Sequence, residues 1–243
     1  QDTSSAASDV YKRQFFYHES IGFEELAEKL ETLLEPTDAE LAFEVFRNAM
    51  DEGPWTGSSQ LRPEEFHARV SWALVRLAAV KSPLALVECQ ELALKCVEKT
   101  ELVSHYLCSL AHDEAERVAE ITIDTLFAKD HFHTAWAKSW LLYVLEQCAD
   151  SIQRSMIGQI TALAESEQEE WLARCAACRV LGKAKLLTHD LANRLWNRAP
   201  DTFHSDLVTA IWQMRDEPWA SVFIDGMNSD VLHVILRHLN HDK

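Results

Sequence analysis

Glycine and proline are both scarce in this sequence, with 6 of each among 243 residues. Glycine supplies the positive φ angles of tight turns and the close backbone approach of phosphate-binding loops. Its scarcity therefore argues against an all-β fold and against a glycine-rich nucleotide site. No apolar run reaches the roughly 18 residues that a bilayer-spanning helix requires, so we expect no membrane partner. The remaining composition, 47% hydrophobic and 26% charged residues, is typical of a globular protein.

Positive charge is in the minority, because 23 basic residues stand against 39 acidic ones and the net charge is −16. A polyanion does not bind nucleic acid through its bulk charge. No secretory signal peptide is visible, and the 6 cysteines lie mostly in segments rich in Leu, Ala and Val. A thiol in such a segment behaves as a small hydrophobic group. We therefore expect a reducing, cytoplasmic setting.

Residues 1–14, QDTSSAASDVYKRQ, are polar and have no helical period. The segment Asp9–Gln14 resembles the translation of a transposon mosaic-end adapter used in sequencing libraries. That resemblance implies an artefactual segment at the end of a metagenomic fragment, with natural sequence of a larger protein missing upstream. An ordinary disordered N-terminus is the alternative interpretation.

Apolar residues recur at helical spacing along the rest of the chain. The spacing predicts helices over residues 23–34, 37–49, 63–77, 83–98, 101–110, 113–128, 133–148, 151–164, 168–182, 189–197, 203–215 and 229–239. Thr37–Glu40 and Ser166–Glu169 have the capping-box pattern of a helix start. No segment alternates apolar and polar residues as a strand does, so the sequence predicts an all-α protein.

A repeat runs through these helices. Residues 136–145 match residues 172–181, with Ala, a basic residue, Val and Leu in equivalent places. Residues 67–70 align with the same pattern two periods upstream, whereas the stretch 103–106 fits it poorly. One helix pair cannot bury its apolar stripe alone, so repeated pairs are expected to stack.

Residues 170–184, EWLARCAACRVLGKA, resemble the second helix of a HEAT-type repeat, with an Arg, then Ala pairs, then Leu-Gly near the helix end. The resemblance covers one unit well and two others weakly. It implies an α-solenoid, a right-handed stack of antiparallel helix pairs, in a single domain from residue 15 to 243. Such repeats serve many functions, so the resemblance bears on the fold more than on the activity.

A second resemblance is carried by the loop Gly53–Trp55 leading into Phe66–Leu77. The region is similar to the C-terminal helical repeats that follow the polymerase in some bacterial antiviral-defence reverse transcriptases. No polymerase motif is present in this chain, so the resemblance implies an accessory region only.

Catalytic signatures are missing from the sequence: there is no G-x-S-x-G elbow, no H-E-x-x-H and no P-loop. Cys175-x-x-Cys178 lacks the second ligand pair that a zinc site needs, and its helical spacing favours core packing. The pair His131 and His133 suits a solvated turn. The C-terminal histidines His233, His238 and His241 suit the end of a helix. We therefore expect no catalytic residue, no metal and no cofactor.

Basic residues concentrate in the segment 171–200, which contains only one acidic residue, Asp190. The basic residues there are Arg174, Arg179, Lys183, Lys185, Arg194 and Arg198. A basic stripe on an acidic protein is suited to contact phosphate or an acidic partner. The alternatives are a solvated face whose cations pair with neighbouring acids and, for Arg174, a hydrogen bond at the edge of the repeat core.

Eight tryptophans are present, and six of them lie in apolar periodic contexts that predict core or seam positions: Trp72, Trp136, Trp140, Trp171, Trp196 and Trp212. Trp55 lies in a Gly/Ser loop, and Trp219 follows a proline between two expected helices. An exposed tryptophan is a good anchor for a partner, so these two are candidate contacts. Folding back over the first helices is the alternative for Trp55.

Three functions follow from these observations. The first is a non-enzymatic helical-repeat scaffold or accessory domain that contacts a protein partner or an upstream domain of its own polypeptide. The second is the accessory region of a defence reverse transcriptase, contacting the polymerase or nucleic acid through Arg174, Arg179, Lys183 and Arg194. The third is a small hydrolase or glycosylase whose carboxylate site has no recognisable motif.

Overall fold

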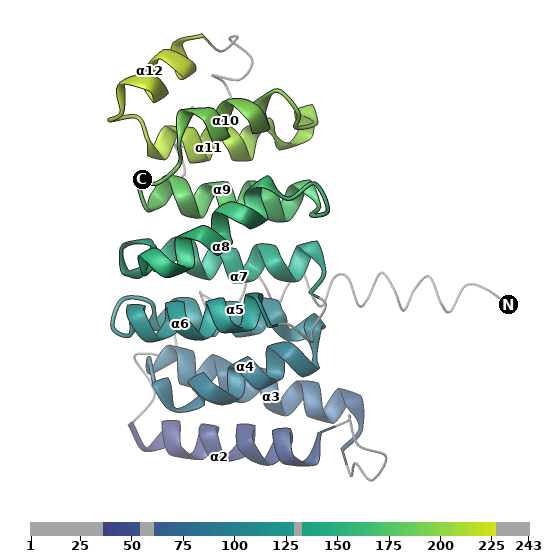
Figure 1. The fold of residues 1–243 in the computed structure, drawn as a ribbon. Helices are drawn as coiled ribbons and strands as arrows, with labels where there is room; N and C mark the ends of the chain where they lie inside the picture. The colour runs from purple at the N-terminus through teal and green to yellow at the C-terminus, as the bar shows by residue number, and fades with distance from the viewer. Residues whose placement is uncertain (1–35, 54–60, 129–132, 227–243) are drawn as a thin grey trace, which may run out of the picture. The chain divides into compact units, whose positions relative to one another are not determined.

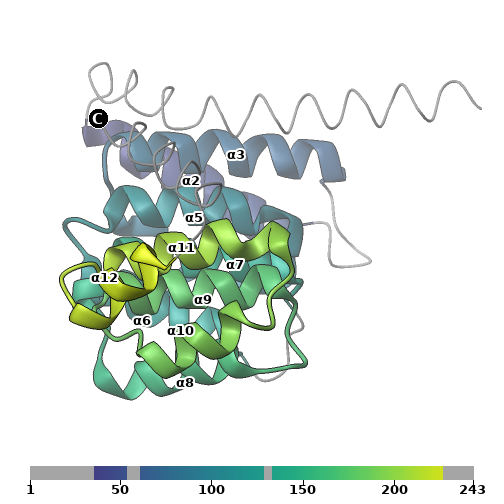
Figure 2. The ribbon, with the colours of Figure 1, turned by 90° about the horizontal axis from the view of Figure 1, so that it is seen from above.

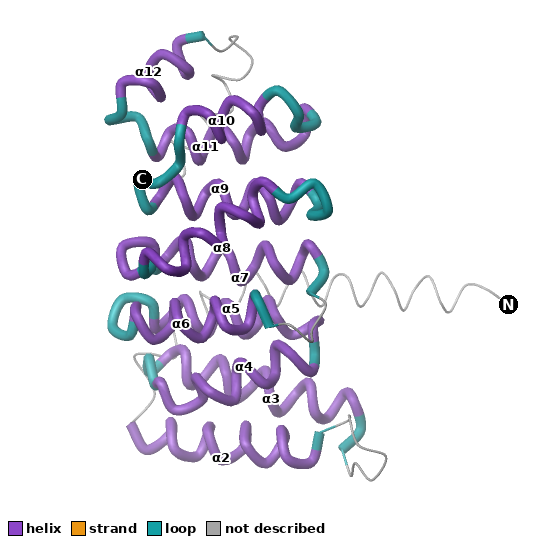
Figure 3. Tube along the Cα trace, viewed as in Figure 1, coloured by secondary structure: helices purple, strands orange, loops and turns teal. Residues whose placement is uncertain are grey.

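The computed structural model describes residues 36–53, 61–128 and 133–226. Every regular element within these ranges is a helix (Figure 1, Figure 3). The predicted all-α class is therefore confirmed. The helices pack in sequential pairs, and the chain divides into two compact units, Gln1–Glu114 and Ala115–Lys243.

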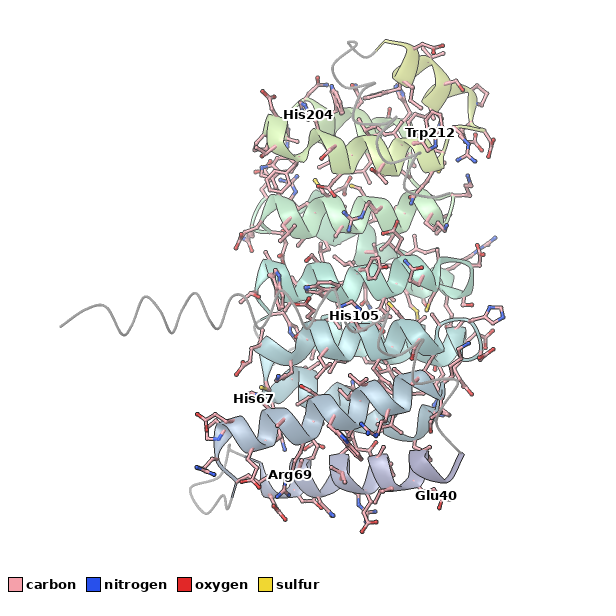
Figure 4. The ribbon with its side chains drawn as sticks, turned by 180° about the vertical axis from the view of Figure 1, so that it is seen from behind. Glu40, His67, Arg69, His105, His204 and Trp212 are labelled. Atoms are coloured by element: carbon pink, nitrogen blue, oxygen red, sulfur yellow. The ribbon has the colours of Figure 1, made fainter. Side chains whose placement is uncertain are left out.

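The described helices of the first unit are α2 (Pro36–Glu52), α3 (Pro63–Ala79), α4 (Leu86–Lys95) and α5 (Thr100–Leu110). Within this unit α2 packs on α3, α4 packs on α5, and α3 also packs on α5. Large side chains fill the core of the unit: Phe46, Phe66, Leu74, Leu77, Leu92, Tyr106 and Leu107. The Tyr106 hydroxyl donates a buried hydrogen bond of 2.7 Å to the Ser82 carbonyl, so this large side chain is satisfied at both its apolar and its polar end. Figure 4 labels Glu40 on α2 and His67 and Arg69 on α3.

The described helices of the second unit are α6 (Ala115–Leu126), α7 (Ala135–Gln147), α8 (Arg154–Glu165), α9 (Trp171–Lys183), α10 (His189–Trp196), α11 (His204–Gln213) and α12 (Pro218–Asp225). We call α6, α8 and α10 the first helices and α7, α9 and α11 the second helices of three pairs. Each first helix packs on the second helix of its own pair. The second helices also pack on one another in order, so α9 contacts both α7 and α11. In Figure 2 the first helices lie along one side of the unit and the second helices along the other.

The contact between α9 and α11 depends on a residue without a side chain. A Cβ atom added to Gly182 would lie far inside van der Waals distance of the Ala210 carbonyl oxygen and 2.8 Å from Gln213 Oε1. Gly182 therefore permits a close approach of the two helices that any other residue would prevent. Gly158, in contrast, has no atom within 4 Å of its added Cβ.

Two helices end in a left-handed residue that is not glycine. Lys81 after α3 has φ 50° and Lys185 after α9 has φ 61°. Behind Lys81 the Ser82 amide donates to the Leu77 carbonyl at 2.9 Å, and behind Lys185 the Leu186 amide donates to the Leu181 carbonyl at 2.8 Å. These hydrogen bonds have the Schellman pattern, which satisfies carbonyls at a helix end.

Most predicted helices are present, with boundaries shifted by a few residues. The segment predicted as one helix over 83–98 is a 3₁₀ turn at Pro83–Ala85, helix α4 and a second 3₁₀ turn at Val97–Lys99. Ser82 is at the N-cap position of the first 3₁₀ turn, but its side chain makes no capping hydrogen bond. The predicted helices over 23–34 and 229–239 lie outside the described residues.

Two local predictions are wrong. Helix α12 was not expected, because Pro218 suggested a connection between helices, whereas it occupies the first turn, where a missing N–H has no cost. The capping box at Ser166–Glu169 does not form: Glu170 is at the N-cap position of α9 without a side-chain cap hydrogen bond, and Ser166 accepts a hydrogen bond from the Gln168 amide at 3.3 Å. Among the described helices, none has the length and apolar character needed to cross a bilayer.

Candidate functional site

The six basic residues predicted as a contact stripe are distributed over three different environments. Arg174 is turned into the protein and is 5% exposed. Its Nε donates to the Ala164 carbonyl at 3.0 Å, and its guanidinium lies 4.0 Å from the centre of the Trp171 ring. Ala164 is in the last turn of α8, whose carbonyls lack intrahelical donors. The alternative prediction for Arg174, a hydrogen bond at the edge of the core, is confirmed.

Arg179 connects three second helices. Its Nε donates to Glu146 Oε2 of α7 at 3.2 Å, and its Nη1 pairs with Asp206 Oδ1 of α11. The other oxygen of Glu146 accepts from the Gln213 amide at 2.8 Å, also from α11. The side chains of Arg179, Glu146 and Asp206 are 22%, 14% and 30% exposed. One guanidinium with two partly buried carboxylates thus links all three helix pairs of the unit.

Three more cations pair with acids of a neighbouring helix pair. The Arg194 guanidinium of α10 pairs with Glu165 at the end of α8, and Arg198 pairs with Glu167 at 2.8 Å. Lys185 donates to the Gln213 carbonyl and lies 3.5 Å from Asp216. These three pairs are mostly exposed and contribute little stability individually. They matter more for the surface charge. Each of these cations is paired with an acid that lies outside the segment 171–200.

Lys183 differs from the other five basic residues. It is exposed at the end of α9 and has no ion-pair partner among the described residues. It lies one turn after Arg179, so both residues are on the same side of the helix. Of the predicted stripe, only this cation is available to an incoming ligand without breaking an internal contact.

An aromatic stripe on α7 was not predicted from the sequence. Trp136, Trp140 and Tyr143 follow one another at i, i+4 and i+7, which places them on one helix face. Neighbouring rings in this series meet edge to face, with centroids 6.0 Å apart in both pairs. Trp136 is 41% exposed, and Trp72 on α3 is 37% exposed under the guanidinium of Arg76. Of the core or seam positions predicted for these two tryptophans, the core is therefore excluded.

The two tryptophans proposed as partner contacts are placed differently. Trp55 lies outside the described residues. Trp219 is in the first turn of α12, half-buried, with its ring centre 5.6 Å from that of His189. Trp196 stacks on His204 at 4.2 Å, and the ring of Phe223 meets it edge to face. Trp219 is thus at the margin of an aromatic cluster that holds α12 against the last helix pair.

Five of the six cysteines are buried, and Cys108 is half-buried. All six fall within the described residues, and none forms a disulfide. Cys175 and Cys178 are buried, which confirms the core packing expected from their spacing. Burial raises the pKa of Cys175 to about 12 and the pKa of Cys148 to about 11, and it raises the pKa of Cys178 further. The reactive thiolate is therefore suppressed at neutral pH.

The histidine pairs do not assemble into a site among the described residues. His133 is buried, and its Nε2 lies 2.9 Å from the Thr125 carbonyl. His131 and the C-terminal histidines His233, His238 and His241 lie outside the described residues. In the part of the chain that the structure describes, no three His, Cys, Asp or Glu side chains are grouped as metal ligands.

The side of the second unit formed by α7, α9 and α11 is the strongest candidate for contact with another molecule. It combines the exposed Trp136 ring on α7, the Arg179 network on α9 and the half-buried Trp212 near the end of α11, which is labelled in Figure 4. This combination is suited to binding and offers no nucleophile paired with a base. No protein family, curated protein or solved structure matches this chain.

Proposed function

We propose that this chain is a non-enzymatic helical-repeat scaffold of the HEAT-like α-solenoid type, which binds a protein partner through the second helices of its repeats. The observation that carries the proposal is the set of polar bonds that join successive helix pairs in the second unit. Their partners are 27 to 33 residues apart in the chain, about the length of one pair. Bonds at this regular spacing support a stack of equivalent helix pairs, in which each pair buries apolar surface against its neighbours.

The surface chemistry also supports protein binding. Soluble proteins leave aromatic rings such as Trp136 exposed at contact sites more often than elsewhere. The surrounding helices are fixed by buried side chains such as Leu141 and Val144, so the exposed rings are held in place before a partner arrives. A rigid aromatic surface loses little entropy on binding.

Nucleic-acid binding by a reverse-transcriptase accessory region has weaker support. Its four proposed contacts were Arg174, Arg179, Lys183 and Arg194, and all of them except Lys183 already have internal partners. Nucleic-acid affinity depends on the number of phosphates neutralised. One available cation among these four contacts, on a chain of net charge −16, is a poor basis for it.

A display experiment tests the proposal. A phage library of random 16-residue peptides is selected against the folded full chain, with the urea-denatured chain as counter-selection, and a dT20 oligonucleotide is titrated in parallel at low salt. We expect peptides that bind only the folded chain and no binding of dT20. Failure to enrich any fold-dependent peptide contradicts the scaffold. Salt-sensitive dT20 binding that is lost in Arg179→Glu/Lys183→Glu instead favours the nucleic-acid function.

A further inference from the structure

The outer sides of α2 and α3 form one surface with exposed apolar side chains. Leu41 on α2 is 54% exposed and Trp72 on α3 is 37% exposed. We define the α2–α3 end face by six side chains on this surface: Leu41, Val45, Glu52, Arg69, Trp72 and Arg76. We propose that residues 23–34 of the same chain form an amphipathic helix whose apolar side packs on this face.

The six side chains of the α2–α3 end face lie together. The three on α2 occur at i, i+4 and i+11 and the three on α3 at i, i+3 and i+7, so each set follows one side of its helix. The Arg69 guanidinium lies 3.5 Å from Glu52 and also pairs with Glu65 at 2.6 Å, which places the two sides next to each other. Figure 4 shows Glu40 and Arg69 towards opposite ends of this antiparallel pair.

The apolar part of the face requires an apolar occupant. The Arg76 guanidinium lies 4.0 Å from the centre of the Trp72 ring, so this ring is held in place while much of its surface stays in contact with water. Exposed apolar side chains that are grouped on one face mark a contact site. Covering Leu41 and Trp72 removes their apolar area from water and stabilises whatever packs there.

The segment 23–34 has the pattern that this face needs. Its apolar residues are at positions 23, 26, 27, 30, 33 and 34, which is one side of a helix. Its four glutamates are at positions 24, 25, 28 and 31, on the opposite side. In a stack of helix pairs, the terminal element must be apolar towards the stack and polar towards water. The segment matches both requirements.

The short link to α2 selects this segment over other occupants. Only Glu35 separates Leu34 from Pro36, the first residue of α2. A residue before proline is biased away from helical geometry, so the chain is expected to turn there instead of extending α2. A 12-residue helix is about 18 Å long, enough to run back along two thirds of α2. So short a link gives the segment an effective concentration far above that of a second copy of the chain.

Hydrogen–deuterium exchange of the full chain, read by mass spectrometry, tests the contact from the side of the face. Exchange of residues 23–34 is compared in the wild type, Leu41→Asp, Trp72→Ser and the control Val87→Asp, which changes an exposed aliphatic residue of α4 in the same unit. Circular dichroism melting confirms that each variant folds, and light scattering gives the oligomeric state.

A second set of variants tests the contact from the side of the segment. Leu26→Asp/Leu30→Asp places carboxylates on the apolar side, and Glu24→Asp/Glu28→Asp places the same residue on the polar side. We expect the first pair to speed exchange at residues 36–45 of α2 and the second pair to leave it unchanged. Loss of helix propensity alone would affect both pairs equally.

We expect residues 23–34 of the wild type to exchange at least about tenfold more slowly than an unfolded chain, because an isolated helix of this length is marginal in water. Leu41→Asp and Trp72→Ser should each speed this exchange at least about fivefold, and Val87→Asp less than about twofold. Exchange of the segment at the unfolded rate in the wild type overturns the proposal, as does equal acceleration by Val87→Asp. Protection that is lost when a dimer is diluted to monomer assigns the face to a second copy instead. The contact is intramolecular, so none of these results depends on the scaffold function.

Discussion

The two units differ in how their charged side chains are used. In the first unit, Arg69 pairs with Glu65 one turn away on the same helix and with Glu52 at the end of α2, and Lys95 pairs with Glu91 within α4. In the second unit, bonds such as those of Arg179 join residues 27 to 33 positions apart. Charged side chains there join one helix pair to the next. The distance between the partners along the chain is therefore about one repeat.

The two units also differ in the size of their buried side chains. Tyr106 of α5 and Ala177 of α9 are both fully buried. A phenol ring and a methyl group require different distances to the neighbouring helix.

The largest effect is expected where α9 and α11 approach most closely. Gly182→Ala places a methyl group against the Ala210 carbonyl, so the helices must separate, and we expect a loss of about 1–3 kcal/mol in the free energy of unfolding. Gly158→Ala is the control, since its position is open and alanine gains about 1 kcal/mol in a helix. Urea denaturation measures both. A neutral Gly182→Ala contradicts the close approach of α9 and α11.

Arg174 provides the next test. Arg174→Met keeps much of the apolar stem but removes the donor to the Ala164 carbonyl, which leaves a helix-end acceptor unsatisfied. We expect a loss of about 1–2 kcal/mol. Arg154→Met, at an exposed position of α8, should change the free energy of unfolding by less than about 0.5 kcal/mol. Equal effects of the two substitutions in urea denaturation contradict a structural role for the Arg174 guanidinium.

A direct comparison of the units uses one arginine from each. Arg179→Met leaves two partly buried carboxylates, Glu146 and Asp206, without their cation, and we expect a loss of about 1–2 kcal/mol. Arg69→Met removes a guanidinium that also contacts two carboxylates, but these are more exposed, so about 0.5 kcal/mol is expected. Urea denaturation at 0.05 and 0.5 M salt measures both losses. A larger loss in the free energy of unfolding for Arg69→Met than for Arg179→Met contradicts the difference between the units.

The smallest effect concerns pH and the first unit. Burial, followed by the charge of Lys99, lowers the pKa of His67 from its ordinary value of 6.5. The unfolded chain therefore binds a proton on His67 more readily than the folded one, so this contribution to stability is complete above pH 6.5 and is lost as the pH falls towards the lowered folded-state pKa. When the pH is lowered from 7.5 to 5.5, the melting temperature of His67→Gln should therefore fall less than that of the wild type. Identical pH profiles contradict the shift.

Much of the fold was predictable because helical periodicity is a local property. Helix α3 has Phe66, Val70 and Leu74 at the spacing of one buried face, and all three are buried. Helix α12 was missed because eight residues contain too few turns to show a period. The segment 83–98 was predicted as one helix because its apolar pattern continues through Cys96, where the backbone leaves helical geometry at φ −139°.

The candidate surface was less predictable. On α7 apolar residues occur on every side, with Ala135, Trp136 and Ala137 in succession, so the pattern does not distinguish the exposed ring from its buried neighbours. The basic segment 171–200 was identified from the sequence, but the acids that neutralise it come from other helices. Glu146 and Asp206 lie outside that segment in the chain and meet Arg179 only when three helix pairs are stacked.

The sequence by itself determined that this protein is helical, where most of its helices lie and that some of them repeat, because these properties depend on spacing within one or two turns. Only the tertiary structure decided which cations have no acidic partner, which tryptophans are exposed and which helices approach each other at Gly182. Each of these depends on what a neighbouring helix places a few ångströms away, and that distance is set by packing between segments about one repeat apart.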